Sequence, residues 1–213
     1  MNGLAAIDGG MAYHTRTLRQ GRFAPLFDAL IRLPALSDAD LSQFSTIVIP
    51  CRTNGRRLAR DRDRLAAFVD AGGFLVVLGE TRPNLFLDGV TFDPVPTNFW
   101  WWLDPGADLG VRISAPHHPL MASLSPADVT WHVHGTLHLA EGGTTLASWQ
   151  SGDRGGPIMV ETQRGHGRLL LTSLDPVYHH GSGFMPATTR FLDVFFPWLA
   201  AETQARSRRH THA

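Results

Sequence analysis

Short apolar runs divide this chain of 213 residues into segments typical of an α/β protein. The runs at residues 4–7, 46–50, 74–78 and 168–174 show no regular alternation of polar and apolar positions. Strands of this kind are usually covered on both faces, as in a parallel sheet between helices. Apolar residues repeat at helical spacing between the second and third run, and Gly72 and Gly73 would end that helix. The pattern predicts a strand–helix–strand unit over residues 45–79.

The two ends of the chain repeat this pattern. Pro25 is expected to open a helix that carries Leu26, Leu30 and Leu33 and stops at Pro34. Near the C-terminus a loop is expected over residues 175–183, followed by a final helix from Pro186. Pro197 lies inside that helix and predicts a kink or an early end.

The middle of the chain has a different character. Five short segments that favour strands and turns lie at residues 90–95, 111–114, 129–135, 144–149 and 157–161, and residues 165–167 (GHG) indicate a hairpin turn. The predicted fold class is therefore α/β: a flavodoxin-like, open, mostly parallel sheet with helices on both faces and an antiparallel extension. We expect a single domain over residues 1–204 and a disordered tail over residues 205–213.

Composition excludes several classes of function. The 19 basic and 19 acidic residues cancel, which argues against nucleic-acid binding. One cysteine allows no internal disulfide, no basic leader precedes the first apolar run, and no run approaches the ~18 apolar residues of a membrane helix. We expect a cytoplasmic protein that does not bind a membrane.

In an open parallel sheet, ligands bind beyond the carboxyl ends of the strands. That rule selects the loops at residues 8–10, 51–55, 79–84 and 175–183, which carry most of the candidate chemistry.

Four motifs in order resemble the class I glutamine amidotransferase-like superfamily, in particular its ThuA-like (trehalose-utilisation) branch. They are TIVIPCRTNG (46–55), LAAFVDAGGFLVVLGE (65–80), HHPLMASL (117–124) and GHGRLLLTSLDPVYHH (165–180). The resemblance implies the same fold and a link to sugar metabolism. It also implies a nucleophilic cysteine near Gly79, where this chain has none, and a His-x-Glu pair where it has Leu174-Asp175-Pro176. Glutamine hydrolysis is therefore not expected, since that reaction needs a thiolate.

Candidate acid–base groups lie on two of the selected loops. Glu80 stands where the nucleophile would be, and Asp175, His179 and His180 form a dense polar cluster with Tyr178. Such groups can transfer protons or bind sugar hydroxyls. The alternative is structural, with Glu80 paired to an arginine and Asp175 closing a turn.

Further residues are candidates for ligand contact. Cys51, Arg52 and Asn54 follow a strand, and His134 alternates with His132, which would place both on one face of a strand. With His138, or with His179 and His180, they could bind a transition metal, but we favour an ordinary polar face, because no cysteine and no carboxylate accompanies them at a fixed spacing, and we assign no metal and no cofactor.

Residues 99–102 (FWWW) form an aromatic run that includes Trp101. Three interpretations remain open: a satellite core, a homo-oligomer contact through Trp100–Trp102, and a platform for stacking on a ligand.

Two functions are compatible with these features. The first is a non-glutaminase domain that binds a small polar, carbohydrate-related ligand or a partner chain. The second is an enzyme that acts on a sugar-like substrate through Glu80, Asp175, His179 and His180.

Overall fold

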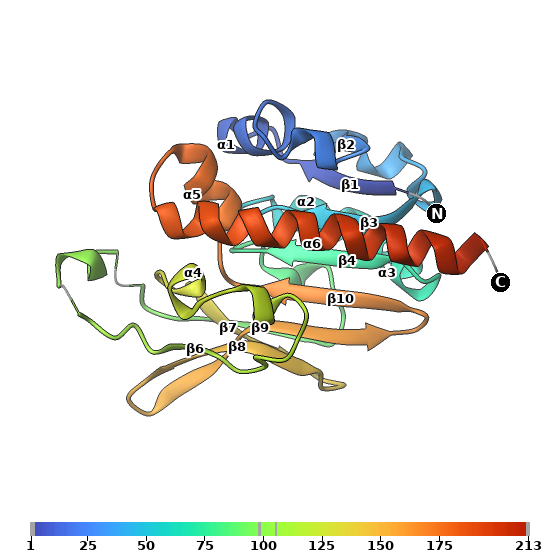
Figure 1. Cartoon of the computed structure of the whole chain (residues 1–213). Helices are drawn as coiled ribbons and strands as arrows, with labels where there is room; N and C mark the ends of the chain where they lie inside the picture. The colour runs from blue at the N-terminus through green and yellow to red at the C-terminus, as the bar shows by residue number, and fades with distance from the viewer. Residues whose placement is uncertain (1–2, 98, 105, 212–213) are drawn as a thin grey trace.

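The structure, a computed structural model, describes residues 3–97, 99–104 and 106–211, without the side chains of residues 102 and 209–211. Its centre is an eight-stranded sheet in the order β2-β1-β3-β4-β10-β9-β8-β6 (Figure 1). The first five strands of that order run parallel, and the last three continue the sheet antiparallel. A separate two-stranded sheet pairs β5 with β7. The predicted fold class, an open and mostly parallel sheet with an antiparallel extension, is confirmed.

The bounds of the elements follow. The strands are β1 Gly3–Asp8, β2 Ala29–Arg32, β3 Phe44–Ile49, β4 Phe74–Leu78, β5 Val90–Pro94, β6 Val111–Ile113, β7 Gly135–Leu139, β8 Thr144–Ser151, β9 Arg154–Arg164 and β10 Gly167–Thr172. The α-helices are α1 Ala12–His14, α2 Gly55–Leu58, α3 Arg62–Asp70, α4 Pro126–Val129, α5 Pro176–Ser182 and α6 Pro186–Thr211; a π-helical turn spans Thr15–Arg19, and 3-10 turns include Ala24–Leu26, Leu33–Asp38, Ala59–Asp61 and Trp101–Leu103.

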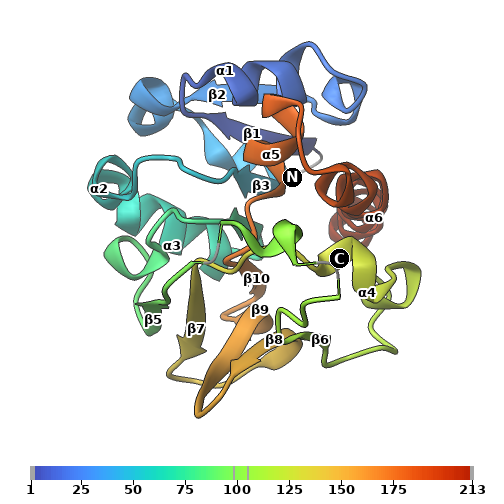
Figure 2. The ribbon, with the colours of Figure 1, turned by 90° about the vertical axis from the view of Figure 1, so that its left-hand side faces the viewer.

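Helices cover both faces of the parallel part of the sheet, as the apolar runs predict. Alternate residues of β4 divide between two cores: Val76 packs with Phe191 and Phe195 of α6, and Val77 with α3 on the other face. Figure 2 shows α6 and α3 on opposite sides of the sheet. None of the described helices is both long and apolar enough to cross a bilayer.

The helix expected from Pro25 is wrong. The structure has a 3-10 turn followed by β2, an edge strand that pairs in parallel with β1. The leucine spacing fits a helix, but pairing with β1 satisfies the backbone, and Asp28 accepts a hydrogen bond from the backbone N–H of Leu4 at 2.8 Å. Tertiary pairing here overrides local periodicity.

The loop expected over residues 175–183 is also wrong, because residues 176–182 form α5. Pro176 occupies the first turn, where its missing N–H costs nothing, and Gly183 ends the helix at φ +80°. The predicted hairpin turn at residues 165–167 is confirmed between β9 and β10, with Gly165 at φ +55°.

The strand expected over residues 129–135 is wrong as well. Val129 ends α4, residues 130–134 are irregular, and β7 begins only at Gly135. The side chains of Trp131 and Val133 enter the core instead of standing on a sheet.

The final helix does not end at Pro197; α6 continues through Thr211. Contacts beyond the proline hold it to the sheet, since Thr203 donates a hydrogen bond to Thr46 at 2.7 Å and Arg206 to the Gly72 carbonyl at 2.6 Å. Residues 205–211 are thus helical where the sequence predicts a tail, and residues 212–213 lie outside the described part. A single domain over residues 1–204 stays a prediction.

Candidate functional site

Four segments meet at the carboxyl ends of the parallel strands. Asp175 follows β10, Glu80 follows β4 and Arg52 follows β3. The irregular stretch 131–134, just before β7, contacts them through His134. The side-by-side course of the strands brings together residues that lie more than a hundred positions apart in the chain.

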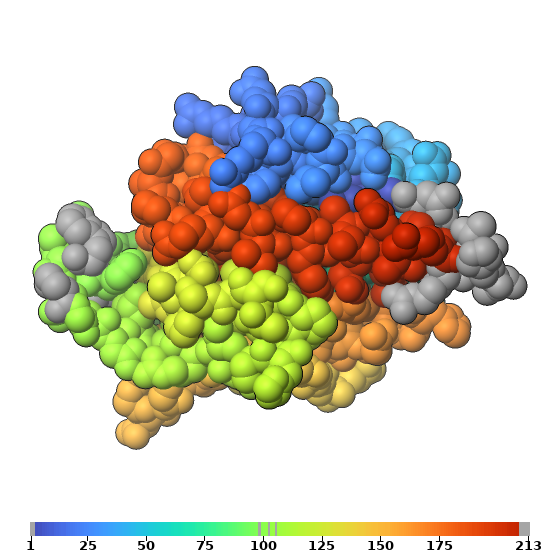
Figure 3. Space-filling view, viewed as in Figure 1, coloured from blue at the N-terminus to red at the C-terminus, as the bar shows by residue number. Residues whose placement is uncertain are grey.

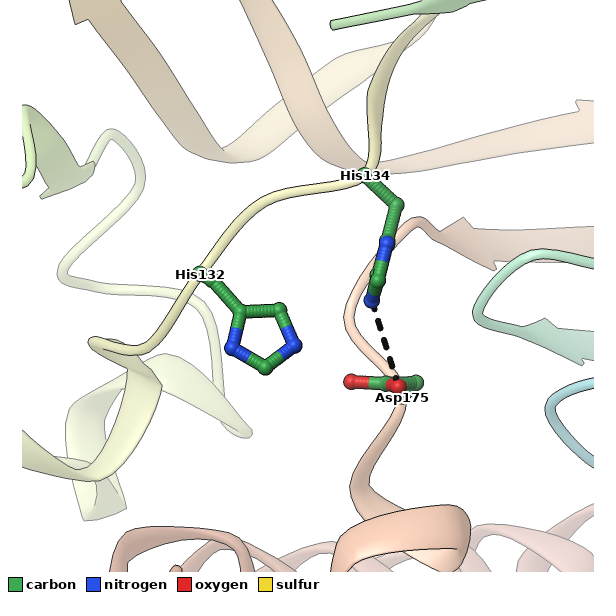
Figure 4. Close-up of side chains that lie close together, drawn as sticks. All are labelled: His132, His134 and Asp175. Carbon is green, nitrogen blue, oxygen red and sulfur yellow. Dashed lines mark hydrogen bonds and ion pairs between the residues drawn. The ribbon is translucent and has the colours of Figure 1, made fainter. Parts of the chain in front are cut away.

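Asp175 lies at the centre of this site and is completely buried. Trp131 Nε1 donates a hydrogen bond to its Oδ1 at 3.3 Å, His179 Nε2 lies 3.1 Å from the same oxygen, and His134 Nε2 lies 3.2 Å from Oδ2 (Figure 4). Burial opposes ionisation, but the hydrogen bonds and charges of the two imidazoles outweigh it and lower the pKa of Asp175 below its ordinary value. The site therefore contains a buried carboxylate.

A second carboxylate is joined to the first. Glu80 Oε1 lies 3.0 Å from His134 Nδ1 and 3.3 Å from an Arg52 guanidinium nitrogen, which is also 3.7 Å from Asp175 Oδ2. The Arg52 guanidinium lies 3.7 Å above the ring of Tyr178. Whereas Asp175 is fully buried, the Glu80 side chain is 38% exposed, so the network extends from the interior to solvent.

Two further imidazoles face one another. The Nε2 atoms of His132 and His179 are 3.1 Å apart, and both rings are buried. Burial lowers the pKa of His132 to about 4, an effect that the nearby Asp175 charge only partly opposes. Neither Nδ1 atom has a hydrogen-bond partner among the described residues.

These rings form one wall of a cavity of about 720 Å³. The other walls are largely aromatic or apolar, with Phe99, Trp101, Tyr178, Phe184 and Met185, and in Figure 3 the green surface near residue 100 lies beside the orange surface of α5. Four of the lining residues also have a buried polar atom without a partner in the described structure: Arg52 Nε, Trp101 Nε1, His132 Nδ1 and His179 Nδ1. An unpaired buried donor or acceptor costs about 1–3 kcal/mol, so these four atoms concentrate an energetic cost beside one cavity.

Most of the residues expected from the sequence lie in or around this network. Six of them contact one another: Arg52, Glu80, His134, Asp175, Tyr178 and His179. Trp101 lines the cavity above them. Their roles in catalysis or binding stay predictions.

Three expected residues lie elsewhere. The His180 ring packs against Phe23, and its Nδ1 lies 2.8 Å from Thr189 Oγ1, because neighbouring residues of a helix point in different directions. Asn54 caps α2 by accepting a hydrogen bond from the Arg57 backbone N–H. Neither side chain lines the cavity.

Cys51 is the third. It is completely buried, the backbone N–H of Tyr178 donates to its Sγ at 3.4 Å, and burial raises the pKa of the thiol. It lies against Gly79, near the position where an amidotransferase nucleophile is expected, but a buried protonated thiol is a poor nucleophile.

Sequence reasoning missed several members of the site. Trp131 was not singled out, although it stands next to His132 in the motif WHVH, and its indole binds Asp175. Phe184, Met185 and Arg190 were also missed, because they follow a loop that is in fact a helix. Phe99 and Trp100 are 54% and 67% exposed, and the proposed oligomer contact there stays a prediction.

Comparison with known proteins is informative only at the level of structure. No family profile matches the sequence, and no curated protein matches it closely. A cytoplasmic protein from Salmonella typhimurium shares the fold with a TM-score of 0.54 and 13% identity, over 92% of this chain and 98% of that one. A putative ThuA-like protein from Bacteroides uniformis does so with a TM-score of 0.54 and 14% identity, over 90% and 87% of the two chains.

A β-galactosidase from Rahnella sp. R3 also matches, with a TM-score of 0.53 and 18% identity over 91% of this chain. The match spans 32% of that enzyme's length. At these identities the likeness shows the fold alone. This chain therefore has a ThuA-like fold.

Proposed function

We propose that this protein belongs to the non-glutaminase branch of the amidotransferase-like superfamily and binds a small, hydroxylated, carbohydrate-like ligand in the aromatic cavity. The observation that carries the proposal is a largely aromatic and apolar cavity, four of whose lining residues have a buried polar atom without a partner in the described structure. Sugars offer both hydroxyl groups for such atoms and C–H faces that pack on aromatic rings.

The charges around the cavity favour a neutral ligand over a phosphate or a sugar acid. Two arginines line it, and both already have carboxylate partners: Arg52 pairs with Glu80 and Asp175, and Arg190 pairs with Asp128 at 2.7 Å. An anionic ligand would have to compete with these carboxylates, whereas a neutral polyol can accept or donate hydrogen bonds without displacing them.

The comparisons support the same class of ligand. Among the proteins with this fold, one is a putative ThuA-like protein and another is a β-galactosidase of which the matching part is about a third. The sequence motifs that resemble the ThuA-like branch point independently to sugar metabolism.

The test is a titration of the purified full-length chain with a panel of neutral mono- and disaccharides, followed by tryptophan fluorescence and calorimetry. We expect at least one sugar to bind at one site per chain and Trp101→Ala to weaken it at least ~10-fold, since one indole contact contributes more than ~1 kcal/mol in a binding centre. Trp100→Ala is the matched control, because Trp100 is adjacent and does not line the cavity. No saturable binding across the panel, or equal loss in both variants, would refute the proposal.

A second candidate function is acid–base catalysis on the same ligand, favoured by the position of His134 between two carboxylates. Glu80 is the exposed one and the better placed to reach a substrate proton. p-Nitrophenyl glycosides provide the assay: turnover that Glu80→Gln abolishes supports catalysis, and absence of turnover in the wild-type chain leaves binding as the function.

A further inference from the structure

Contacts join the buried side chains of His132, His179, Asp175 and His134 in that order, which gathers three imidazoles and one carboxylate in the interior. We propose that they form a binding site for one divalent transition-metal ion, such as Zn²⁺, at the inner end of the cavity. Zinc can be measured without any sugar, so the failure of this inference and the failure of the proposed function are separable.

The first support is the spacing of the donor atoms. A tetrahedral zinc site with bonds of 2.0–2.1 Å places its ligand atoms about 3.3 Å from one another. His179 Nε2 lies 3.1 Å from both His132 Nε2 and Asp175 Oδ1, and His134 Nε2 lies 3.2 Å from Asp175 Oδ2. One donor atom each from His132, His134 and Asp175 can be chosen so that all three lie within 4.8 Å (Figure 4). His179 lies outside that group of three, so a shared ion needs its ring, which already contacts His132 and Asp175, to move toward His134.

The second support is the direction in which the lone pairs face. His134 Nδ1 lies 3.0 Å from Glu80, so a proton on Nδ1 leaves the Nε2 lone pair directed at the Asp175 carboxylate. The Nε2 atoms of His132 and His179 likewise face each other. Without a metal ion each pair needs a proton between its two atoms, as in the hydrogen bonds to Asp175 described above. One metal ion would replace these protons and bind the facing donors together.

The third support is the surroundings. A carboxylate that holds the second nitrogen of a ligating histidine is usual around protein metal sites, and Glu80 occupies that place for His134. All four side chains are more than nine-tenths buried, and His132 and His179 also line the cavity, which gives an ion a path from solvent. Nitrogen and oxygen donors without sulfur suit Zn²⁺, Fe²⁺ or Ni²⁺ rather than Cu⁺, and Cys51 is engaged elsewhere.

The experiment starts with the full-length chain freed of metal by a chelator. Titration with Zn²⁺ against a chromophoric chelator is expected to give one equivalent per chain. His132→Ala and His179→Ala are each expected to weaken binding at least ~100-fold, because each removes a direct ligand, and even outer-shell partners contribute 10–100-fold. His138→Ala is the matched control, since His138 is half exposed on β7 and pairs with Asp93. A chain with His210→Ala and His212→Ala removes two further imidazoles near the C-terminus and is expected to bind as the wild-type chain does.

A second measurement needs no variant, in case a substitution prevents folding. X-ray absorption at the zinc edge of the loaded wild-type chain is expected to show at least two imidazoles in an oxygen and nitrogen shell without sulfur. Three results would overturn the inference: no stoichiometric zinc, zinc that is lost only in the C-terminal double variant, and a shell without imidazole.

Discussion

Gly79 lies where β4 ends against the site, and its replacement by alanine tests how tightly the site is packed. Gly79 has φ +68°, and an added Cβ would lie 2.4 Å from Cys51 Cβ and 3.0 Å from Asp175 Cβ. The left-handed conformation costs alanine about 1–2 kcal/mol, and forcing a methyl group into a packed interior costs about 1–3 kcal/mol more. We therefore expect Gly79→Ala to lower the free energy of unfolding by about 2–5 kcal/mol.

Gly142→Ala separates the two contributions. Gly142 has φ +76°, close to that of Gly79, but nothing lies within 4 Å of an added Cβ. Only the conformational cost of about 1–2 kcal/mol is expected there. The assay is urea unfolding followed by tryptophan fluorescence, with the free-energy change taken from the midpoint and slope. Equal losses in the two variants would refute the packing argument, because the conformational term is common to both.

Three further predictions test separate contacts. Trp131→Phe keeps a buried ring but removes the hydrogen bond to the Asp175 carboxylate, so we expect a loss of about 1.5–3 kcal/mol in urea unfolding; an unchanged midpoint would contradict it. Arg168→Met removes the guanidinium that binds Glu161 at 2.6 Å and Glu202 at 2.7 Å, and it is expected to cost about 3 kcal/mol in urea unfolding. Arg112→Met breaks an exposed ion pair with Asp108 and is expected to leave the midpoint nearly unchanged. Equal effects of the two substitutions would argue against burial as the cause. Burial lowers the pKa of His14, so on acidification the unfolded chain takes up a proton near pH 6.5, before the folded chain does, and the free energy of unfolding falls as the pH drops below that value. His14→Gln is expected to flatten this dependence of stability on pH. An unaltered slope of stability against pH would exclude His14 as its source.

The parallel core of the fold could be predicted because its strands are buried on both faces. Residues 46–50 and 74–78 have no polar alternation, and only helices on both sides can cover such strands. The same reasoning fails for β2, a short strand at the sheet edge. Leu30 in this strand and Leu26 in the turn before it fit a helical period, and only the pairing with β1 makes residues 29–32 a strand.

The site could be predicted as far as it lies at strand ends. Arg52, Glu80 and Asp175 each follow a different parallel strand, and the topology alone brings them to one edge. The choice between His179 and His180 could not be made, because it depends on α5. In a loop both could reach the cavity, whereas on a helix they diverge by about 100° and only His179 reaches Asp175.

Backbone strain and unpaired polar atoms gather around the cavity, and this argues that the site is kept for function rather than for stability. Three non-glycine residues in the described structure have positive φ, and two of them, Arg52 and Met185, line the cavity. Such a conformation costs of order 1–3 kcal/mol, and buried ionic networks are often no more stabilising than apolar packing of the same volume. A fold whose two cores are otherwise filled by leucine, valine and phenylalanine has no structural need for an ion network at the end of its sheet. Strain and unpaired polar atoms at the same cavity are expected where a ligand or a metal ion completes the arrangement, and they are difficult to explain where nothing binds.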